Sequence, residues 1–203
     1  MHSFSSRLVE NAVGQLASLP GIGRKTAFRF VLHLLRQDKK EVDRLINSIR
    51  ELKELIRECK YCHNISDNEI CEICSNPNRD ASIICVVENI QDVGSIEATE
   101  QFKGVYHVLG GIISPMDGTG PGDIHVDTLL SRVAGQGVRE VIFALSATIE
   151  GDTTGYYIFK KLPRREELIV TTIAKGISVG NELEYTDELT LGRSIVNRIK
   201  FSM

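Results

Sequence analysis

The chain has 203 residues and a net charge of −3, and its 42% hydrophobic and 25% charged residues are ordinary for a globular protein of one large or two small domains. The first thirty residues hold no basic-then-apolar leader, and no apolar run reaches membrane-spanning length, so secreted and membrane-spanning classes are not expected. Cysteines stay reduced in the cytosol, the expected compartment, so clustered cysteines indicate metal or redox chemistry rather than disulfides.

Basic residues gather at the N-terminal end. Residues 1–58 hold eleven Lys and Arg against seven Asp and Glu, which leaves the remainder of the chain acidic. Segment 11–37 has no acid at all but holds four cations: Arg24, Lys25, Arg29 and Arg36. A basic end on an acidic body indicates that one end meets nucleic acid, although a solvated helix face would carry the same charges.

Three helices are expected in residues 1–58. Apolar residues recur at helical spacing over 8–16, and Leu19-Pro20-Gly21-Ile22-Gly23 ends that helix. A second helix has an apolar inner face made of Ala27, Phe30, Val31, Leu34 and Leu35. Asp38 and Glu41 resemble a capping box at the start of a third helix. We expect that helix to bury Val42, Leu45, Ile46, Ile49, Leu52 and Ile56.

The glycine turn between the first two helices is a candidate phosphate site. Glycine lets backbone approach a ligand closely, and the free amides at the start of the second helix favour an anion. Lys25 and Arg29 are four residues apart and share a helix face. The GxxxxGK[ST] spacing of a P-loop is absent, and no strand precedes the turn. A helix-hairpin-helix module that grips DNA is therefore favoured over a plain connection, with these candidate residues: Gly21, Gly23, Arg24, Lys25 and Arg29.

Four cysteines form two CxxC pairs, Cys59 with Cys62 and Cys71 with Cys74, separated by eight residues. Four thiolates suit tetrahedral Zn²⁺ and leave no open position, which predicts one structural zinc ion per chain. An iron–sulfur cluster and a redox pair are the alternatives. His63 is expected to be a surplus surface residue. Lys60 either adds donors around the metal or faces water, and Cys85, in an apolar run, is expected in the core.

The pattern changes from Ser82 onward. Short apolar runs at 83–87, 104–109, 141–145 and 168–173 are typical of buried strands. Helical stretches near 90–102, 124–135 and 153–161 alternate with them, which predicts a parallel sheet with helices on both faces. A connection rich in Gly and Pro spans 110–122, and a last helix is expected near 187–199.

Three acidic residues follow two of these strands. Glu88 ends the first strand, whereas Glu150 and Asp152 follow the third. The carboxyl ends of parallel strands meet at one edge, so the three carboxylates are expected to converge there, although acids at strand ends can simply be solvated. Such a cluster could hold Mg²⁺ or dock a basic partner, and its pattern resembles the Toprim fold of topoisomerases and primases. A topoisomerase would need a nucleophilic tyrosine nearby, but Tyr156 and Tyr157 are expected in a packed helix.

The order of these segments resembles one family, RecR. The motifs LPGIGRKTAFR, CKYCHNISDNEICEICSNPNRD, YHVLGGIISPMDGTGP, IEGDTT and LEYTDELTLGR carry the resemblance over nearly the whole chain. It implies DNA binding, partnership with RecO and RecF, and ring-like homo-oligomers, with a tetramer favoured and a dimer next. The family's DNA-contacting Lys and Arg correspond to Lys25 and Arg29. The chain departs from the family pattern at Asp152, Ser178 and Asn181.

The sequence thus predicts an α+β protein without membrane contact. Its expected regions are a helix-hairpin-helix region at 1–58, a four-cysteine zinc finger at 59–74, a Toprim-like domain with a parallel sheet at 82–177, and a short C-terminal helical region at 178–203. The favoured function is a non-enzymatic, sequence-independent DNA-binding recombination mediator in bacterial cytoplasm. A Mg²⁺-dependent Toprim-type enzyme acting on DNA is the alternative, and a scaffold without DNA contact is a third.

Overall fold

The computed structural model describes residues 6–135, 137–177, 180, 182–198 and 200. Ser178 and Asn181, two of the departures from the family pattern, lie outside these residues. The chain forms two compact units, residues 1–56 and 57–203. No described helix is both long and apolar enough to cross a membrane.

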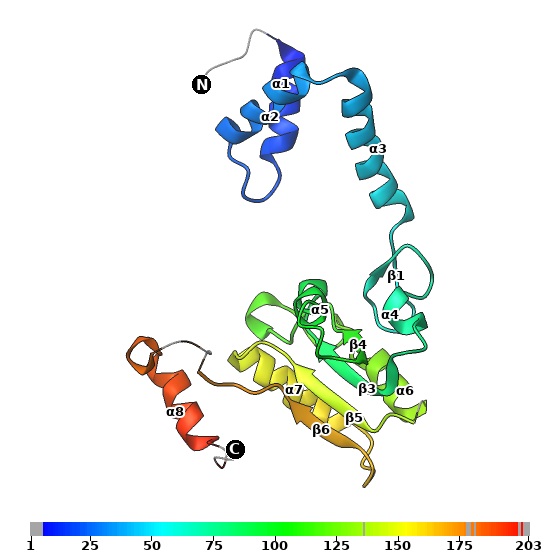
Figure 1. Cartoon of the computed structure of the whole chain (residues 1–203), viewed down its shortest axis with the longest axis vertical. Helices are drawn as coiled ribbons and strands as arrows, with labels where there is room; N and C mark the ends of the chain where they lie inside the picture. Colours follow the sequence, from blue (N-terminus) through cyan, green and yellow to red (C-terminus); the bar gives the residue numbers. More distant parts are fainter. Residues whose placement is uncertain (1–5, 136, 178–179, 181, 199, 201–203) are drawn as a thin grey trace. The chain divides into compact units, whose positions relative to one another are not determined.

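The first unit contains three helices, α1 (Arg7–Ala17), α2 (Arg24–Arg36) and α3 (Lys39–Leu55) (Figure 1). The side chain of Ser6 accepts a hydrogen bond from the Val9 amide and caps α1. Helices α1 and α2 pack around a small core of Val13, Ala27 and Val31. The expected hairpin of two helices is therefore present.

Several expectations about burial in this unit are wrong. On α2, Phe30 and Leu35 are exposed instead of lying on an inner face. Helix α3 has no buried residue among those described, and its apolar stripe is open to solvent: Leu45, Ile46, Ile49 and Leu52. Helical periodicity predicts that something covers such a stripe, but it does not specify that the cover belongs to the same chain.

The capping box expected at the start of α3 is also absent. Asp38 is the N-cap residue, but its side chain makes no capping hydrogen bond. The Glu41 side chain pairs instead with Arg44, one turn further along the helix. In a capping box the Glu41 carboxylate would accept a hydrogen bond from the Asp38 amide. Here the ion pair with Arg44 uses that carboxylate instead.

The second unit begins with the cysteine segment, which holds β1 (Arg57–Glu58), β2 (Ile65–Ser66) and the short α4 (Glu72–Ser75). The α/β part follows with β3 (Asp80–Val87), α5 (Ile90–Glu97), β4 (Gly104–Val108), the 3-10 turn η1 (Pro115–Asp117), α6 (Val126–Gly135), β5 (Glu140–Ala144), α7 (Ile149–Lys161) and β6 (Ile169–Thr172). The C-terminal region holds η2 (Leu183–Tyr185) and α8 (Glu188–Val196).

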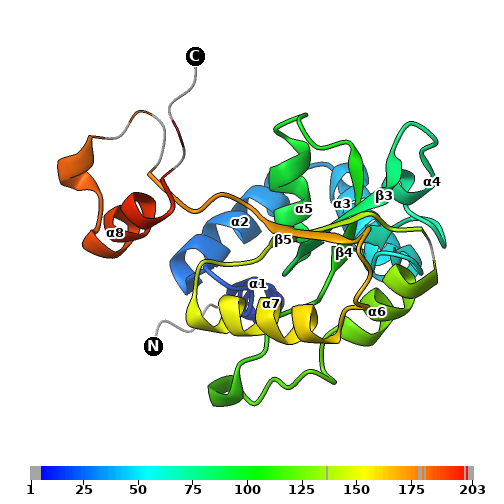
Figure 2. The same ribbon diagram turned by 90° about the horizontal axis from the view of Figure 1, so that it is seen from below.

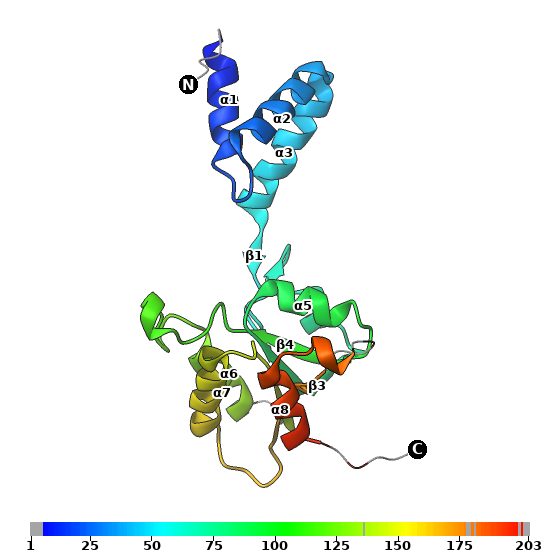
Figure 3. The ribbon, with the colours of Figure 1, turned by 90° about the vertical axis from the view of Figure 1, so that its left-hand side faces the viewer.

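The predicted parallel sheet is confirmed, with strand order β4-β3-β5-β6 and every pairing parallel. Helices α6 and α7 cover one face and α5 covers the other (Figures 2 and 3). Alternate residues of β3 divide between the two cores. Ile84 and Val86 pack with α6 and α7, whereas Cys85 and Val87 pack with α5. The expectation that Cys85 is a core residue is confirmed, since it is only 2% exposed.

Helix α7 begins at Ile149, four residues earlier than the sequence pattern indicated. Thr148 caps it, because its side chain accepts a hydrogen bond from the Gly151 amide at 3.1 Å. The cap places Glu150 and Asp152 in the first turn of a helix rather than in a loop. Helix α5, by contrast, ends at Glu97, before the expected 102.

Gly151, in the first turn of α7, lies directly against the backbone of the preceding loop. A Cβ at this position would meet the carbonyl oxygen of Ser146 at 2.1 Å, whereas a Cβ at Gly155 would reach only ordinary contact with Leu145, at 3.7 Å. The backbone of Ser146 comes so close that only glycine fits at position 151 without a shift of the loop. A helix start surrounded by solvent would not require glycine.

We predict that Gly151→Ala lowers the free energy of unfolding by about 1–3 kcal/mol, because the added methyl group must displace backbone. Gly155→Ala, on the same helix, is the control. Its free energy of unfolding should equal that of wild type or exceed it by up to about 1 kcal/mol. Urea unfolding of both variants measures the difference. Equal stability of the two variants would contradict the close approach.

Candidate metal centre and nucleic-acid interface

The four paired cysteines come together in the second unit. The Sγ atoms of Cys59, Cys62, Cys71 and Cys74 all lie within 4.8 Å of one another. Three of these residues are buried and Cys74 is half-buried. Backbone amides also point at the sulfurs, since the Cys71 amide donates to Cys59 Sγ at 3.3 Å and the Cys74 amide donates to Cys71 Sγ at 3.4 Å. Such N–H···S bonds stabilise thiolate charge.

The turns around the first CxxC pair are held by backbone hydrogen bonds. The His63 amide donates to the Cys59 carbonyl at 2.9 Å, and the Cys59 amide donates to the Asn64 carbonyl at 2.7 Å. The Val108 amide, at the end of β4, donates to the Cys62 carbonyl at 2.8 Å. The turn that carries Cys59 and Cys62 therefore also joins the cysteine segment to β4 of the sheet.

The sulfurs lie close enough for each thiol to shift the pKa of its neighbour. Cys62 Sγ and Cys71 Sγ are 3.5 Å apart. Hydrogen bonding to Cys71 raises the pKa of Cys62, and the same contact lowers the pKa of Cys71. A four-thiolate metal centre places a cation where these protons lie and uses all four sulfurs. The donor set and its burial therefore fit a structural Zn²⁺ ion.

His63 is not the surplus surface residue that the sequence indicated. Its side chain is only 14% exposed. Its Nε2 atom lies 2.9 Å from Thr128 Oγ1, and its ring stacks on His125 with centroids 3.7 Å apart. No sequence pattern signals this contact, because the partners are more than sixty residues away. Lys60, in contrast, is exposed and pairs with Glu69 at 3.2 Å.

The glycine turn of the first unit keeps the start of α2 open. Gly21 has φ of +77°, a left-handed conformation that glycine adopts without strain. Gly23 is the N-cap residue and offers no side chain to cap the first amides of α2. Lys25 and Arg29 are both exposed on this helix. An uncapped helix start beside two exposed cations can bind a phosphate group.

Arg24, the remaining cation of the turn, is engaged within the unit. Its guanidinium forms an ion pair with Glu10 of α1. This pair links the two helices of the hairpin on either side of the turn, with both side chains still partly exposed. A role for Arg24 in DNA binding stays a prediction, and any phosphate would have to share this guanidinium with Glu10.

The three candidate acids follow the carboxyl ends of neighbouring strands. Glu88 comes directly after β3, whereas Glu150 and Asp152 lie in the first turn of α7, which follows β5. Strands β3 and β5 are paired in parallel, so the acids belong to one edge of the sheet. Among the described residues, however, these three carboxylates do not form a group in which one oxygen from each lies within 4.8 Å of the other two.

Asp152 already has basic partners within the chain. It forms an ion pair with Lys175, just beyond β6, and a longer one of 3.8 Å with Arg193 of α8. Neither cation was singled out from the sequence, because Lys175 and Arg193 are 23 and 41 positions beyond Asp152 and no spacing rule connects them to it. The pairing connects α7, the segment after β6 and α8 around one carboxylate.

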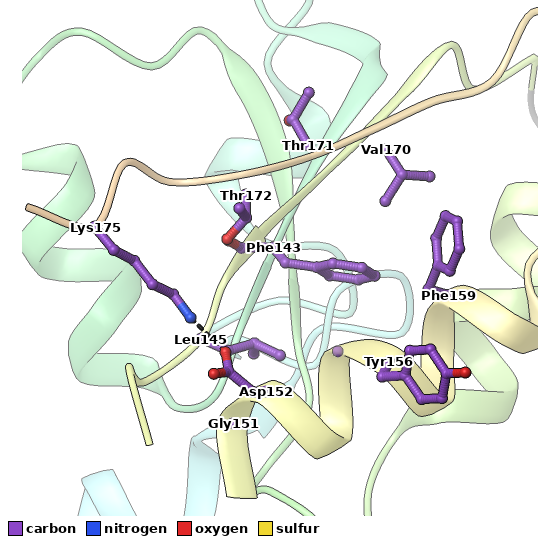
Figure 4. Close-up of a pocket in the computed structure, with 11 residues that line it drawn as sticks. Phe143, Leu145, Gly151, Asp152, Tyr156, Phe159, Val170, Thr171, Thr172 and Lys175 are labelled. Atoms are coloured by element: carbon purple, nitrogen blue, oxygen red, sulfur yellow. Dashed lines mark hydrogen bonds and ion pairs between the residues drawn. The ribbon is translucent and has the colours of Figure 1, made fainter. Parts of the chain in front are cut away.

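Asp152 and Lys175 also line one end of a hollow of about 350 Å³ between α7 and the strands β5 and β6 (Figure 4). The other end is aromatic, with Phe143, Tyr156 and Phe159. The Tyr156 hydroxyl points away from Asp152 in this view. The hollow is therefore largely an apolar groove with one charged end.

Family models match the chain in four consecutive segments. They describe the helix-hairpin-helix of RecR, over residues 9–53; the four-cysteine zinc finger domain of RecR, over 56–76; a Toprim domain, over 82–174; and the C-terminal region of RecR, over 176–199. Among curated relatives, recombination protein RecR of Bacteroides fragilis is 59% identical over 199 residues, which cover 98% of this chain and 97% of the relative.

Two further relatives carry the same name. Recombination protein RecR of Porphyromonas gingivalis is 54% identical over 202 residues, which cover 100% of this chain and 97% of the relative. That of Flavobacterium psychrophilum is 57% identical over 198 residues, which cover 98% and 96%. The similarity thus extends through the hairpin, the cysteine segment and the α/β part alike.

We predict that Cys62→Ser abolishes metal binding at the four-cysteine centre and destabilises the second unit, because three thiolates and a hydroxyl no longer close the tetrahedron. Elemental analysis and thermal unfolding measure the two effects. Cys85→Ala is the matched control, since it removes a buried thiol outside the centre and should retain the metal. Purified wild type with neither zinc nor iron would contradict the assignment.

Proposed function

The chain belongs to the RecR family, and on that premise we propose that it is a non-enzymatic mediator of DNA recombination and repair in the bacterial cytoplasm, acting with RecO and RecF. The observation that carries the proposal is the open start of α2, where a glycine turn, uncapped amides and two exposed cations lie together. These are the groups that hold a phosphate, and they contain nothing that would read a base.

The proposed DNA contact is independent of sequence. Backbone amides and the side chains of Lys25 and Arg29 recognise phosphate charge, which every nucleotide carries. Segment 11–37 contains no acidic residue, and the carboxylate of Glu10, which reaches the start of α2, is paired with Arg24. Binding should therefore depend steeply on salt and only weakly on base composition.

A non-enzymatic role is proposed over a Mg²⁺-dependent Toprim-type enzyme. Metal-dependent chemistry on DNA needs clustered carboxylates and a positioned nucleophile or water. The described carboxylates of Glu88, Glu150 and Asp152 do not gather into one group, and Asp152 is occupied by Lys175. The hydroxyl of Tyr156, one of the two tyrosines that follow Asp152 in α7, points away from Asp152 (Figure 4).

The four-cysteine centre is proposed to hold one structural Zn²⁺ per chain. Cys59, Cys62, Cys71 and Cys74 use every position of a tetrahedral ion, so none is left for a substrate or water. The surrounding strands β1 and β2 have two residues each, and α4 has four. Elements this short gain most of their folding energy from the metal that joins them.

We also propose that the chain assembles into a homo-oligomer, a tetrameric ring in preference to a dimer. The apolar stripe of α3 is exposed in the single chain, with Ile49 59% and Leu52 60% exposed. On α8, Leu189 and Ile195 are also exposed. Apolar helix faces at both ends of the chain give each copy two surfaces to cover, which a ring satisfies.

The acidic residues at the sheet edge are proposed to dock a basic partner, with RecO as the candidate, rather than to catalyse a reaction. Glu88 and Glu150 are half-buried and Asp152 is exposed, in a part of the chain with an acidic balance. Complementary charge mainly raises the rate of association and loses effect in salt. A bound Mg²⁺ ion is the second candidate for the same carboxylates.

Replacing Lys25 and Arg29 together by alanine should weaken DNA binding equally for all sequences. The slope of log affinity against log salt should become shallower by about one for each phosphate that the protein no longer neutralises. Fluorescence anisotropy with unrelated oligonucleotides, over a range of salt, measures both effects. Arg50→Ala with Lys53→Ala, on the last turns of α3, removes the same charge and should change the slope less. An unchanged slope in the first double variant would refute the proposed phosphate site.

Glu150→Gln with Asp152→Asn should slow association with RecO while leaving DNA affinity and zinc content unchanged, because these carboxylates belong neither to the α2 turn nor to the four-cysteine centre, although Asp152→Asn also removes the ion pairs with Lys175 and Arg193. Surface plasmon resonance at low and high salt reports the association rate. Glu166→Gln with Glu167→Gln, in the loop after α7, is the charge-matched control. Mg²⁺-dependent nicking or relaxation of DNA by wild type, abolished in the first variant, would instead establish the enzymatic alternative.

A further inference from the structure

We propose that Glu58, His63 and His125 form a second metal site, which takes a zinc-class transition-metal cation and lies between the cysteine segment and the start of α6. Glu58 ends β1, His63 follows the second cysteine of the first pair, and His125 directly precedes α6. Their ligand atoms all lie within 4.8 Å of one another. None of them belongs to the four-cysteine centre.

The distances from the Glu58 carboxylate to the two imidazoles fit a shared ion better than hydrogen bonds. Glu58 Oε2 lies 3.6 Å from His63 Nδ1 and 3.8 Å from His125 Nε2. Both distances exceed hydrogen-bond length. Two ligands bonded to Zn²⁺ at tetrahedral angles lie roughly 3.4 Å apart, given bonds of about 2.0–2.1 Å. The gap between these atoms is therefore close to the gap that a coordinated ion requires.

Thr128 orients His63 for this role. The Thr128 hydroxyl donates to the His125 carbonyl at 3.1 Å, so it can only accept from His63 Nε2, 2.9 Å away. The imidazole proton of His63 therefore lies on Nε2, and Nδ1 presents its lone pair toward Glu58. A metal-binding histidine usually has its other nitrogen held in this manner.

The backbone turn after Cys62 fixes where the His63 ring lies. His63 has φ of +59°, a left-handed conformation that is uncommon outside glycine but that histidine enters more readily than most residues. The turn holds the half-buried ring, whose side chain is 14% exposed, beside Thr128 and His125.

Coordination requires one movement, a rotation of the His125 ring. The two rings are stacked with 7° between their planes, whereas a metal ion lies in the plane of each imidazole that binds it. The His125 side chain is 36% exposed, so its ring is not enclosed by the protein. Its backbone stays in place, because its carbonyl accepts hydrogen bonds from His107 Nε2 at 2.8 Å and from Thr128.

The ligand types select the metal. Two imidazoles and one carboxylate suit Zn²⁺ and neighbouring transition metals, whereas Mg²⁺ and Ca²⁺ prefer oxygen ligands alone. Three protein ligands leave a fourth position for water, so this ion should exchange more readily than the one in the closed four-thiolate centre. Because two ligands come from the cysteine segment and the third from the start of α6, the ion would join these parts of the unit.

The test is the number of metal ions that the full-length protein binds. Wild type that carries its first zinc ion is titrated with Zn²⁺ by calorimetry, and with Co²⁺ by absorption spectroscopy. We expect a second equivalent, whose Co²⁺ spectrum lacks a sulfur-to-metal charge-transfer band. His125→Ala should abolish this equivalent and keep the first. Thr128→Ala should weaken it about tenfold, because the orienting hydrogen bond is removed.

Two further variants make the result decisive. Glu58→Gln alters an exposed side chain and should also remove the second equivalent, even if His125→Ala disturbs the four-cysteine centre. His33→Ala, on α2, removes a histidine outside the cluster and should keep both equivalents. A single equivalent in wild type at micromolar metal would overturn the proposal, and so would a second equivalent that survives in both Glu58→Gln and His125→Ala.

Discussion

The second unit depends on the convergence of four sulfurs from a segment that has almost no regular structure. Strands of two residues and a helix of four residues cannot bury enough apolar surface to fold alone. The segment is instead held by its converging sulfurs and its turn hydrogen bonds, and the Val108 amide joins it to the sheet through the Cys62 carbonyl. Metal binding and folding of this segment are therefore the same event.

A buried cation extends this connection into the sheet. Arg132 of α6 is only 9% exposed, and its guanidinium donates to the carbonyl oxygens of Tyr106 at 2.6 Å and Tyr61 at 3.4 Å. Tyr61 lies between the first two cysteines, and Tyr106 lies in β4. Because its donors point at carbonyl groups from both segments, this guanidinium holds α6, the sheet and the cysteine segment together.

The sequence predicted those features that follow from local pattern, namely the hairpin, the cysteine pairs and the alternating strands and helices. It failed where the outcome depends on distant partners. The stacking of His63 on His125 and the pairing of Asp152 with Lys175 join residues that no spacing rule connects. Periodicity also located the apolar stripe of α3 correctly but not its exposure, since Leu52 is 60% exposed.

The pairing of Asp152 constrains how the acidic edge can receive a partner. Lys175 and Arg193 already neutralise this carboxylate, so a basic side chain from another protein must displace them or bind to Glu88 and Glu150 instead. Displacement would release Arg193, and with it one contact that holds α8 near the segment after β6. Partner docking at this edge and the position of the C-terminal helix would then be coupled, because both use the same carboxylate.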